Sequence, residues 1–313
     1  MLNLRRLEHF TALAEEKTFA RAARRLHLTQ PALTRSIQTL EDSLGLLLLD
    51  RAHDGITLTD AGQTLLVRAY RMLAEARALQ REAEQIRGLD SGQVTFGVGV
   101  FPAASFLAAV LVQQAVEHPG LAVKVEIGSW QRLLEFLQRG ELDFVVALTR
   151  SLPPPPGYAV RALPAHRMGF FVRPDHPLAK VGERQARHGL RHFPLISTHM
   201  PERARLHVAA IYGLAAEQVV DVALACDHIS VLSQVTQSSD SVMFATHEAL
   251  RAELSAGRLC ALPVMNERDT PLPLNLIQPD GRSLSPAAQW MVDCIEAQLR
   301  ACGSESLPVF RRA

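Results

Sequence analysis

The stretch from Asp60 to Ile86 constrains the fold of this chain more than any other part of the sequence. It contains no proline and a single glycine, Gly62. Apolar residues recur at alternating spacings of four and three, as in a heptad repeat, at Leu65, Ala69, Met72, Ala76, Leu79, Ala83 and Ile86. Such a helix is roughly 40 Å long, and its apolar seam needs a partner. We predict a linker helix that mediates dimerisation; packing on the chain's own domain is the alternative.

The residues before this helix contain a short basic island in a chain of net charge +1. No acidic residue interrupts it between Lys17 and Leu40, and its cations are Lys17, Arg21, Arg24, Arg25 and Arg35. A local excess of this kind is typical of a surface that contacts phosphates. A solvated helix face is the simpler alternative, so charge alone does not decide between the two.

Apolar spacing and capping residues predict three helices in the same segment. Thr18 can cap the second and Thr29 the third, and Gly45 can end the third in a left-handed conformation. Two short helices with a tight break describe a helix-turn-helix, whose second helix reads bases in the major groove. The side chains expected to contact DNA are Thr29, Gln30, Pro31, Thr34, Arg35 and Gln38. A three-helix bundle with a polar outer face is the alternative.

A hairpin follows the third predicted helix. Asp54-Gly55 separates two short apolar runs, which is a strong hairpin signal. The hairpin would form a wing beside the helix-turn-helix, with Arg51 placed to reach a phosphate or the minor groove. From spacing alone, a surface arginine explains Arg51 nearly as well.

Together these residues resemble the LysR-type transcriptional regulator family. The resemblance is carried by Thr18 to Ala23, Leu26 to Ile37, Leu40-Glu41, Leu44-Gly45, Asp50-Arg51 and Leu58 to Gly62. Thr29 and Thr34 stand where the family usually has serine, and Leu49 where it usually has phenylalanine. The resemblance implies a DNA-binding regulator with a linker helix and a two-lobed effector domain similar to periplasmic binding proteins.

Strands and helices alternate after the linker, which predicts an α/β fold with mainly parallel sheets. The predicted strands are residues 94–100, 123–127, 142–148, 160–163, 168–172 and 274–277, and the main predicted helices are residues 102–116, 131–138 and 286–301. The expected fold class is an all-α winged helix-turn-helix with a long linker helix, followed by an α/β domain, which the resemblance implies to be a two-lobed, periplasmic-binding-protein-like effector domain. The predicted boundaries are residues 1–59, 60–90 and 91–313, with lobe I at about 91–164 and 266–302 and lobe II at about 165–265.

Two chain crossings between lobes predict a cleft at the carboxyl ends of strands, where ligands of α/β sheets usually bind. The candidate effector contacts are Phe101, Pro102, Ser105, Ser129, Trp130, Thr149, Arg150, Ser197, Thr198, His199 and His228. Helix N–H groups near Pro102 and the guanidinium of Arg150 favour an anionic head. Phe101 and Trp130 favour a planar or apolar body. We therefore expect a small aromatic or short-chain organic acid.

The sequence gives little support to other classes of function. It lacks the G-x-S-x-G, P-loop and H-E-x-x-H motifs, so an enzyme is not expected. Neither a metal nor a cofactor is expected, because its four cysteines form no C-x-x-C and His188 and His192 have no completing ligand. An architectural DNA-binding protein is the other alternative, although the large second domain argues against it. We expect a cytoplasmic homodimer, assembling further into a homotetramer, on a partly palindromic operator, with RNA polymerase as a further partner and no membrane.

Overall fold

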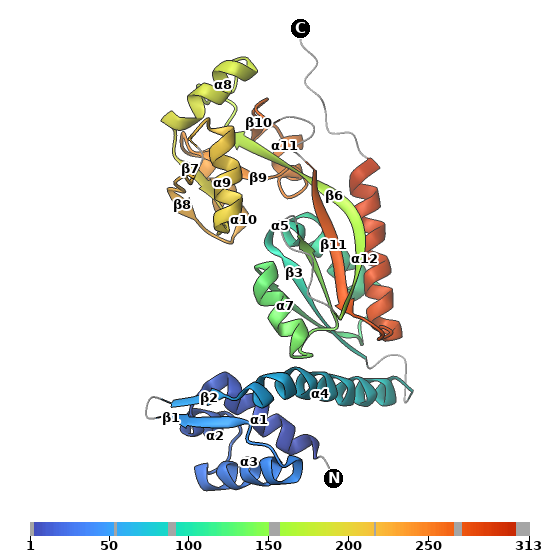
Figure 1. The fold of residues 1–313 in the computed structure, drawn as a ribbon. Coiled ribbons are helices and arrows are strands. Elements are labelled where there is room, and N and C mark those ends of the chain that lie inside the picture. Colours follow the sequence, from blue (N-terminus) through green and yellow to red (C-terminus); the bar gives the residue numbers. More distant parts are fainter. Residues whose placement is uncertain are drawn as a thin grey trace. The chain divides into compact units, whose positions relative to one another are not determined.

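The computed structural model describes residues 3–52, 55–86, 92–149, 157–215, 217–265 and 271–304. The chain forms two compact units, which are described separately below (Figure 1). Unit 1 comprises residues 1–92 together with 135–142, and unit 2 comprises residues 93–134 and 143–313.

Unit 1 begins with the three predicted helices, α1 (Leu4–Glu16), α2 (Phe19–Arg25) and α3 (Gln30–Leu44). The Thr18 side chain caps α2 by accepting from the Arg21 N–H, whereas Thr29 precedes α3 without a side-chain cap. Gly45 ends α3 in the left-handed region at φ 65°. The apolar faces of the three helices meet in one core, which includes Phe10, Leu13, Leu33, Ile37 and Leu40.

The wing is an antiparallel hairpin of β1 (Leu49–Ala52) and β2 (Gly55–Leu58). Glu41 of α3 is buried beneath it and uses Oε1 to accept from the backbone N–H groups of Leu48, at 2.8 Å, and Leu49, at 3.3 Å. Gly62 lies against the start of the wing, because a Cβ there would come within 2.1 Å of the Leu48 carbonyl oxygen. A carboxylate and a glycine therefore fix the wing to the helices on either side of it.

The linker helix α4 spans Asp60–Ile86, as the sequence predicts. Its predicted seam divides into two parts. Leu65 and Ala69 pack into the core of unit 1, whereas Met72 and Leu79 are 44% and 68% exposed. Ala76 is half-buried, and the side chains of Ala83 and Ile86 lie outside the described set. Packing on its own domain, the alternative considered above, therefore accounts for the first part of the seam only.

Unit 2 is built on a mixed sheet in the order β4-β3-β5-β11-β6-β9-β7-β8, with β10 paired to β6. Its strands are β3 (Gln93–Gly99), β4 (Ala122–Gly128), β5 (Phe144–Leu148), β6 (Tyr158–Val172), β7 (Leu195–Ser197), β8 (Leu224–Ala225), β9 (Val242–Thr246), β10 (Cys260–Ala261) and β11 (Pro271–Pro279). Strand β3 is parallel to β4 and β5, and β7 is parallel to β8 and β9. Strands β6 and β11 run antiparallel to their neighbours, so the sheet is less parallel than predicted.

The single long strand β6 corrects the prediction of two separate strands at 160–163 and 168–172. Pro164 separates the two predicted strands and has no N–H for a sheet hydrogen bond. The partner strand β11 shifts its register opposite this proline, between Leu272 and Leu274. This bulge lets the strand continue past Pro164, and β6 therefore runs through both lobes of unit 2.

The helices of unit 2 are α5 (Val100–Pro102), α6 (Ala108–Glu117), α7 (Trp130–Gln138), α8 (Glu183–Gly189), α9 (Glu202–Ile211), α10 (Ile229–Gln237), α11 (Arg251–Ser255) and α12 (Pro286–Ser304). The end of α7, residues 135–138, belongs to unit 1. A π-helix, Ala103–Leu107, joins α5 to α6, so the predicted helix 102–116 is not a regular α-helix. The segment Val100–Glu117 is long and apolar enough to cross a membrane by length and composition. In the fold it supplies Phe106 and Val110 to a core that also takes residues from β3, β5 and α12.

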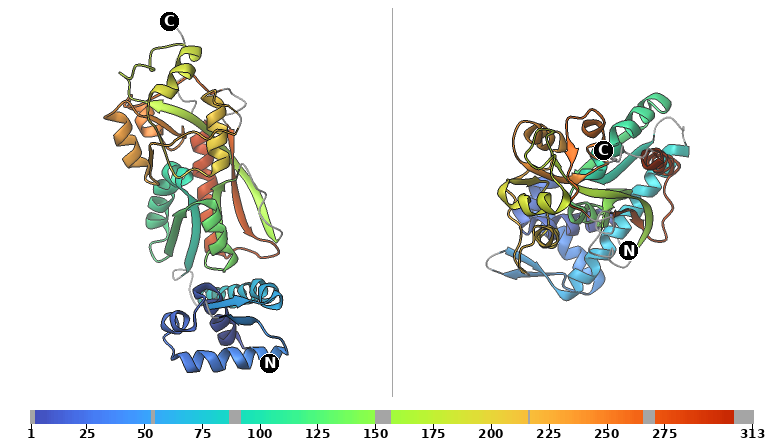
Figure 2. Two further views of the ribbon diagram at one scale, coloured as in Figure 1. Left: turned by 60° about the vertical axis from the view of Figure 1, so that its left-hand side comes forward. Right: turned by 90° about the horizontal axis from the view of Figure 1, so that it is seen from above.

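Two lobes share the sheet (Figures 1 and 2). Each lobe has its own core. The core of lobe I takes residues from β3, β5, β11 and α12, including Phe96, Phe144, Leu276 and Ile295. Lobe II has two smaller apolar clusters around β6, β7 and β9. Because β6 and β11 pass between the lobes, residues far apart in the sequence meet where the lobes face each other.

Candidate functional site

The outer face of α3 is the first candidate site. Thr29, Gln30, Pro31, Arg35 and Gln38 are all exposed, as the helix-turn-helix interpretation requires. Thr34 is half-buried, and its hydroxyl donates to the Gln30 carbonyl at 2.9 Å. The side chain of Arg51 lies outside the described residues. A continuous strip of polar side chains therefore faces solvent at the N-terminal end of α3.

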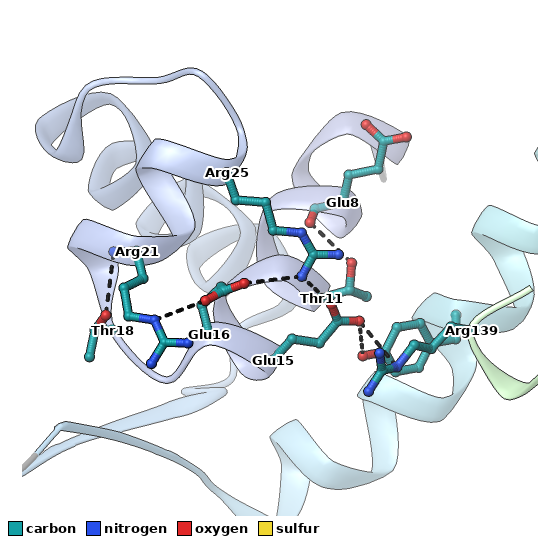
Figure 3. Close-up of polar contacts among 9 residues, drawn as sticks. Glu8, Thr11, Glu15, Glu16, Thr18, Arg21, Arg25 and Arg139 are labelled. Atoms are coloured by element: carbon teal, nitrogen blue, oxygen red, sulfur yellow. Dashed lines mark hydrogen bonds and ion pairs between the residues drawn. The ribbon is translucent and has the colours of Figure 1, made fainter. Parts of the chain in front are cut away.

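The charge of the basic island is smaller than its sequence implies. Arg21 Nε lies 3.1 Å from Glu16 Oε2, and Arg25 pairs with both Glu15 and Glu16 of α1 (Figure 3). The hydrogen bond to Glu15 raises the pKa of Arg25. Two of the predicted phosphate-contacting cations thus hold α2 against α1. Arg24 and Arg35 are exposed, and they are better placed to meet a phosphate or a base.

A buried histidine fixes the position of α3. His9 of α1 is only 8% exposed, and its Nδ1 lies 2.7 Å from Ser36 Oγ on α3. Burial, followed by the nearby Arg5, lowers the pKa of His9. Sequence reasoning missed this pair, because the two residues lie on different helices and only the packing of α1 on α3 brings them together.

The second candidate site is a cavity of about 1040 Å³ in unit 2. Its lobe I wall includes Phe101 and Pro102 of α5, Ser129 and Trp130 at the start of α7, and Thr149 after β5. Lobe II contributes Thr198 and His199, which follow β7. All seven of these residues were candidates in the sequence, and they come from the ends of different strands, as expected for an α/β sheet.

Three other candidates lie off the cavity wall. Ser105 is in the π-helix, where its hydroxyl donates to the Pro102 carbonyl at 2.8 Å. Ser197 is fully buried, and its hydroxyl donates to the Phe244 carbonyl at 2.7 Å. His228 is exposed before α10, and the preceding residue, Asp227, lines the cavity instead. Arg150 lies outside the described residues, so the predicted carboxylate clamp stays a prediction.

Sequence reasoning missed one side of the cavity. Arg203, Ala204 and His207 of α9 line it, together with Met168, Met200, Phe244 and Leu272. The spacing of Arg203 and His207, four apart, indicates a shared helix face, but nothing in the sequence says what that face meets. Met168, Phe244 and Leu272 belong to β6, β9 and β11, strands whose pairing is decided by the tertiary fold.

A histidine and an aspartate lie in contact at the edge of the cavity. His199 Nδ1 is 3.2 Å from Asp227 Oδ2, and the His199 backbone N–H donates to Asp227 Oδ1 at 3.0 Å. In the described part of the chain, no group of three or more His, Cys, Asp or Glu side chains is arranged to hold a metal. Cys226, Cys260 and Cys294 are free thiols. The cavity therefore offers a binding surface of aromatic, aliphatic and polar side chains that includes the guanidinium of Arg203 and the carboxylate of Asp227.

Comparisons with known proteins agree with this geometry. Residues 4–63 match the family described as "Bacterial regulatory helix-turn-helix protein, lysR family", and residues 87–300 match the "LysR substrate binding domain". The chain is 37% identical over 298 residues to the SDS degradation transcriptional activation protein of a Pseudomonas strain, covering 93% of this chain and 94% of that protein.

Solved structures share the fold. ArgP from Mycobacterium tuberculosis superposes with a TM-score of 0.66 at 18% identity, covering 96% of this chain and 98% of that one. Full-length CbnR complexed with its target DNA gives a TM-score of 0.57 at 19% identity, covering 96% and 100%. The chain belongs to the LysR family of DNA-binding transcriptional regulators, with a substrate-binding domain for small-molecule effectors, and it is a regulator and not an enzyme.

Proposed function

We propose that this chain regulates transcription by placing the N-terminal end of α3 in the major groove of its operator. The observation that carries the proposal is the exposed polar strip of α3, opposite a face that buries Leu33, Ile37 and Leu40 in the core of unit 1. Gln30 and Gln38 offer amides that suit adenine, and Arg35 offers a guanidinium that suits guanine. His9 and Ser36 support the strip from behind by holding α3 to α1.

We propose the domain division 1–59, 60–90 and 91–313 for this function. The first segment reads DNA, the second joins the reading head to its partner, and the third binds the effector. The two lobe cores support a boundary near residue 165 and a return near residue 266, because one core takes Leu163 and Leu274 while another takes Met168 and Val264.

The proposed assembly is a homodimer formed through α4, which associates further into a homotetramer. Met72 and Leu79 support it, since they leave exposed apolar surface on one side of a long helix. A two-fold symmetric pair of reading heads would recognise a partly palindromic operator. RNA polymerase is a proposed further partner. A regulator of this kind acts where the chromosome lies, which places it in the cytoplasm.

The proposed effector is an organic acid that binds in the cavity of unit 2. Apolar side chains line most of this cavity, which supports an apolar body, and the guanidinium of Arg203, which lines it together with the carboxylate of Asp227, supports an anionic head. A relative that covers almost the whole chain is an activation protein for SDS degradation, and SDS is an organic anion with an apolar chain. The name of this relative supports the chemical class of the effector, and the lining of the cavity supports the proposed binding site.

A mobility-shift assay with DNA from the region flanking the chain's own gene tests the DNA-binding proposal. The protein should bind one fragment of that region more tightly than random-sequence DNA of equal length. Gln38→Ala should weaken this binding, whereas Arg184→Ala, an exposed change on α8 in unit 2, should not. Equal binding of flanking and random DNA, unaffected by Gln38→Ala, would contradict the proposal.

A further inference from the structure

The cavity of unit 2 separates apolar from charged groups by depth. Its buried lining includes Pro102, Ala147, Met168 and Phe244, which we call the apolar floor. Met168 and Phe244 are only 4% and 5% exposed. Thr198 adds one hydroxyl to the buried part of the described lining. A ligand that reaches this depth is surrounded mainly by carbon and sulfur atoms.

The charged lining residues lie at the solvent end. His199, Arg203 and Asp227 are exposed, and we call these three the charged mouth. The carboxylate of Asp227 already accepts from the His199 backbone N–H and lies against its ring. Arg203 adds a guanidinium to the charged mouth, and His207 lies one helical turn further along the same wall.

The size of the cavity adds a further constraint. At about 1040 Å³ it reaches the top of the range of about 300 to 1,000 Å³ that is typical of pockets for drug-sized ligands. A short carboxylic acid bound at the charged mouth would leave the apolar floor uncovered. An apolar chain joined to an anionic head would cover both, because burial of apolar surface favours the longer molecule.

We propose that the effector is a single-chain amphiphile with an anionic head, whose alkyl tail lies on the apolar floor and whose head lies at Arg203 and His207. The inference rests on the proposed function, because it names the chemical class of the effector for the same cavity. It extends that function from small organic acids to anionic amphiphiles. An alkyl sulfate and a fatty acid share this chemistry, so the head group is a variable of the test.

Calorimetric titration of the full-length protein with hexyl, octyl and decyl sulfate, all below micelle-forming concentrations, tests the tail. One molecule should bind per chain. Each buried methylene contributes about 0.8 kcal/mol, so affinity should rise about four-fold per carbon and on the order of 200-fold from hexyl to decyl sulfate. Decanoate in place of decyl sulfate distinguishes the two head groups. A flat dependence on chain length would refute the amphiphile.

Two pairs of variants test the head and the tail separately. Arg203→Gln should weaken decyl sulfate binding about 10- to 100-fold, as expected for a lost charge-assisted contact, and should leave the dependence on chain length unchanged. Arg184→Gln, an exposed cation outside the cavity, should have no effect. Ala204→Phe, which fills the cavity, should weaken decyl sulfate more than hexyl sulfate. Ala210→Phe, at an exposed position of the same helix, should do neither.

Two further ligands separate specific binding from general detergent binding. Decyltrimethylammonium has the same tail with a cationic head, and inorganic sulfate has the head without a tail; both should bind at least ten-fold more weakly than decyl sulfate. Equal binding of the cationic and anionic amphiphiles, or binding of many molecules per chain that Ala204→Phe leaves unaltered, would overturn the proposal.

The DNA assay is a separate measurement, so the two proposals can fail independently. If the protein binds flanking DNA specifically and no amphiphile binds in the cavity, the proposed DNA-binding function is supported and the proposed class of effector is wrong. If decyl sulfate binds and changes neither the affinity nor the footprint on that DNA, effector control by this class is wrong. Specific binding at both sites, with a shift in the footprint on adding decyl sulfate, is the expected result.

Discussion

Replacement of Glu41 by alanine is expected to loosen the wing from the helix-turn-helix. Glu41 is 8% exposed, and its carboxylate accepts from the backbone N–H groups of Leu48 and Leu49, two residues that are 1% and 6% exposed. A buried donor that loses its acceptor costs about 1 to 3 kcal/mol. The 3.3 Å bond to Leu49 belongs at the lower end of this range, so Glu41→Ala should lower the free energy of unfolding of unit 1 by about 2 to 4 kcal/mol.

Hydrogen exchange of the Leu48 and Leu49 amides, read by mass spectrometry, reports this change directly. Both tryptophans, Trp130 and Trp290, belong to unit 2, so tryptophan fluorescence does not report on unit 1. Far-UV circular dichroism during urea unfolding is therefore used to obtain the free energy of unfolding. Glu41→Gln keeps an acceptor oxygen and should cost less than the alanine change. The exposed Glu8→Ala is the control. Unaltered exchange of both amides, with a loss no larger than that of Glu8→Ala, would refute the reasoning.

Three further predictions concern DNA binding, assembly and pH. Arg35→Ala should weaken operator binding by about 1 to 3 kcal/mol, mostly at one base position; equal losses on operator and random DNA in a mobility-shift series would make Arg35 a phosphate contact. Leu79→Glu should give smaller species in light scattering and lower operator affinity, because pairing of two α4 helices would bury the new charge. Val67→Glu, on a different exposed face of α4, should have neither effect. An unchanged mass for Leu79→Glu would mean that the seam does not pair chains. Burial, followed by the nearby Arg251, lowers the pKa of His166 from 6.5 to about 4. The contribution of neutral His166 to the stability of unit 2 is therefore complete above pH 6.5 and is lost as the pH falls toward 4, up to about 3 kcal/mol. Urea unfolding at several pH values should show the free energy of unfolding falling over this range, and His166→Gln should make the fall smaller. An equal fall in the variant would contradict the assignment.

The sequence determined the local features of unit 1. The spans of α1, α2 and α3, the Gly45 cap and the full length of α4 follow from capping residues and apolar periodicity. These signals act between residues three or four apart, so they can be read without knowing the tertiary fold. The exposed strip of α3 follows for the same reason, because a helix fixes which side chains share a face.

Contacts between different helices were beyond the reach of the sequence pattern. Glu15 and Glu16 neutralise much of Arg21 and Arg25, which only the packing of α1 on α2 decides. The linker seam shows the same limit, since Ala69 packs in its own core and Leu79 does not. A heptad pattern identifies an apolar face but does not say which neighbour covers it.

The lining of the cavity in unit 2 likewise contains residues that the sequence predicted and residues that it did not. Phe101, Trp130, Thr149 and His199 were correctly predicted to line the cavity because each was expected at the carboxyl end of a strand. The carboxyl ends of parallel strands meet at one edge of a sheet, which brings such residues together. The α9 face, and Met168 and Phe244 of the apolar floor, were decided by the tertiary structure alone. They come from strands and a helix whose neighbours lie far away in the sequence, as with β6 and β11. Local periodicity fixes which residues share a face, whereas long-range pairing fixes what that face meets.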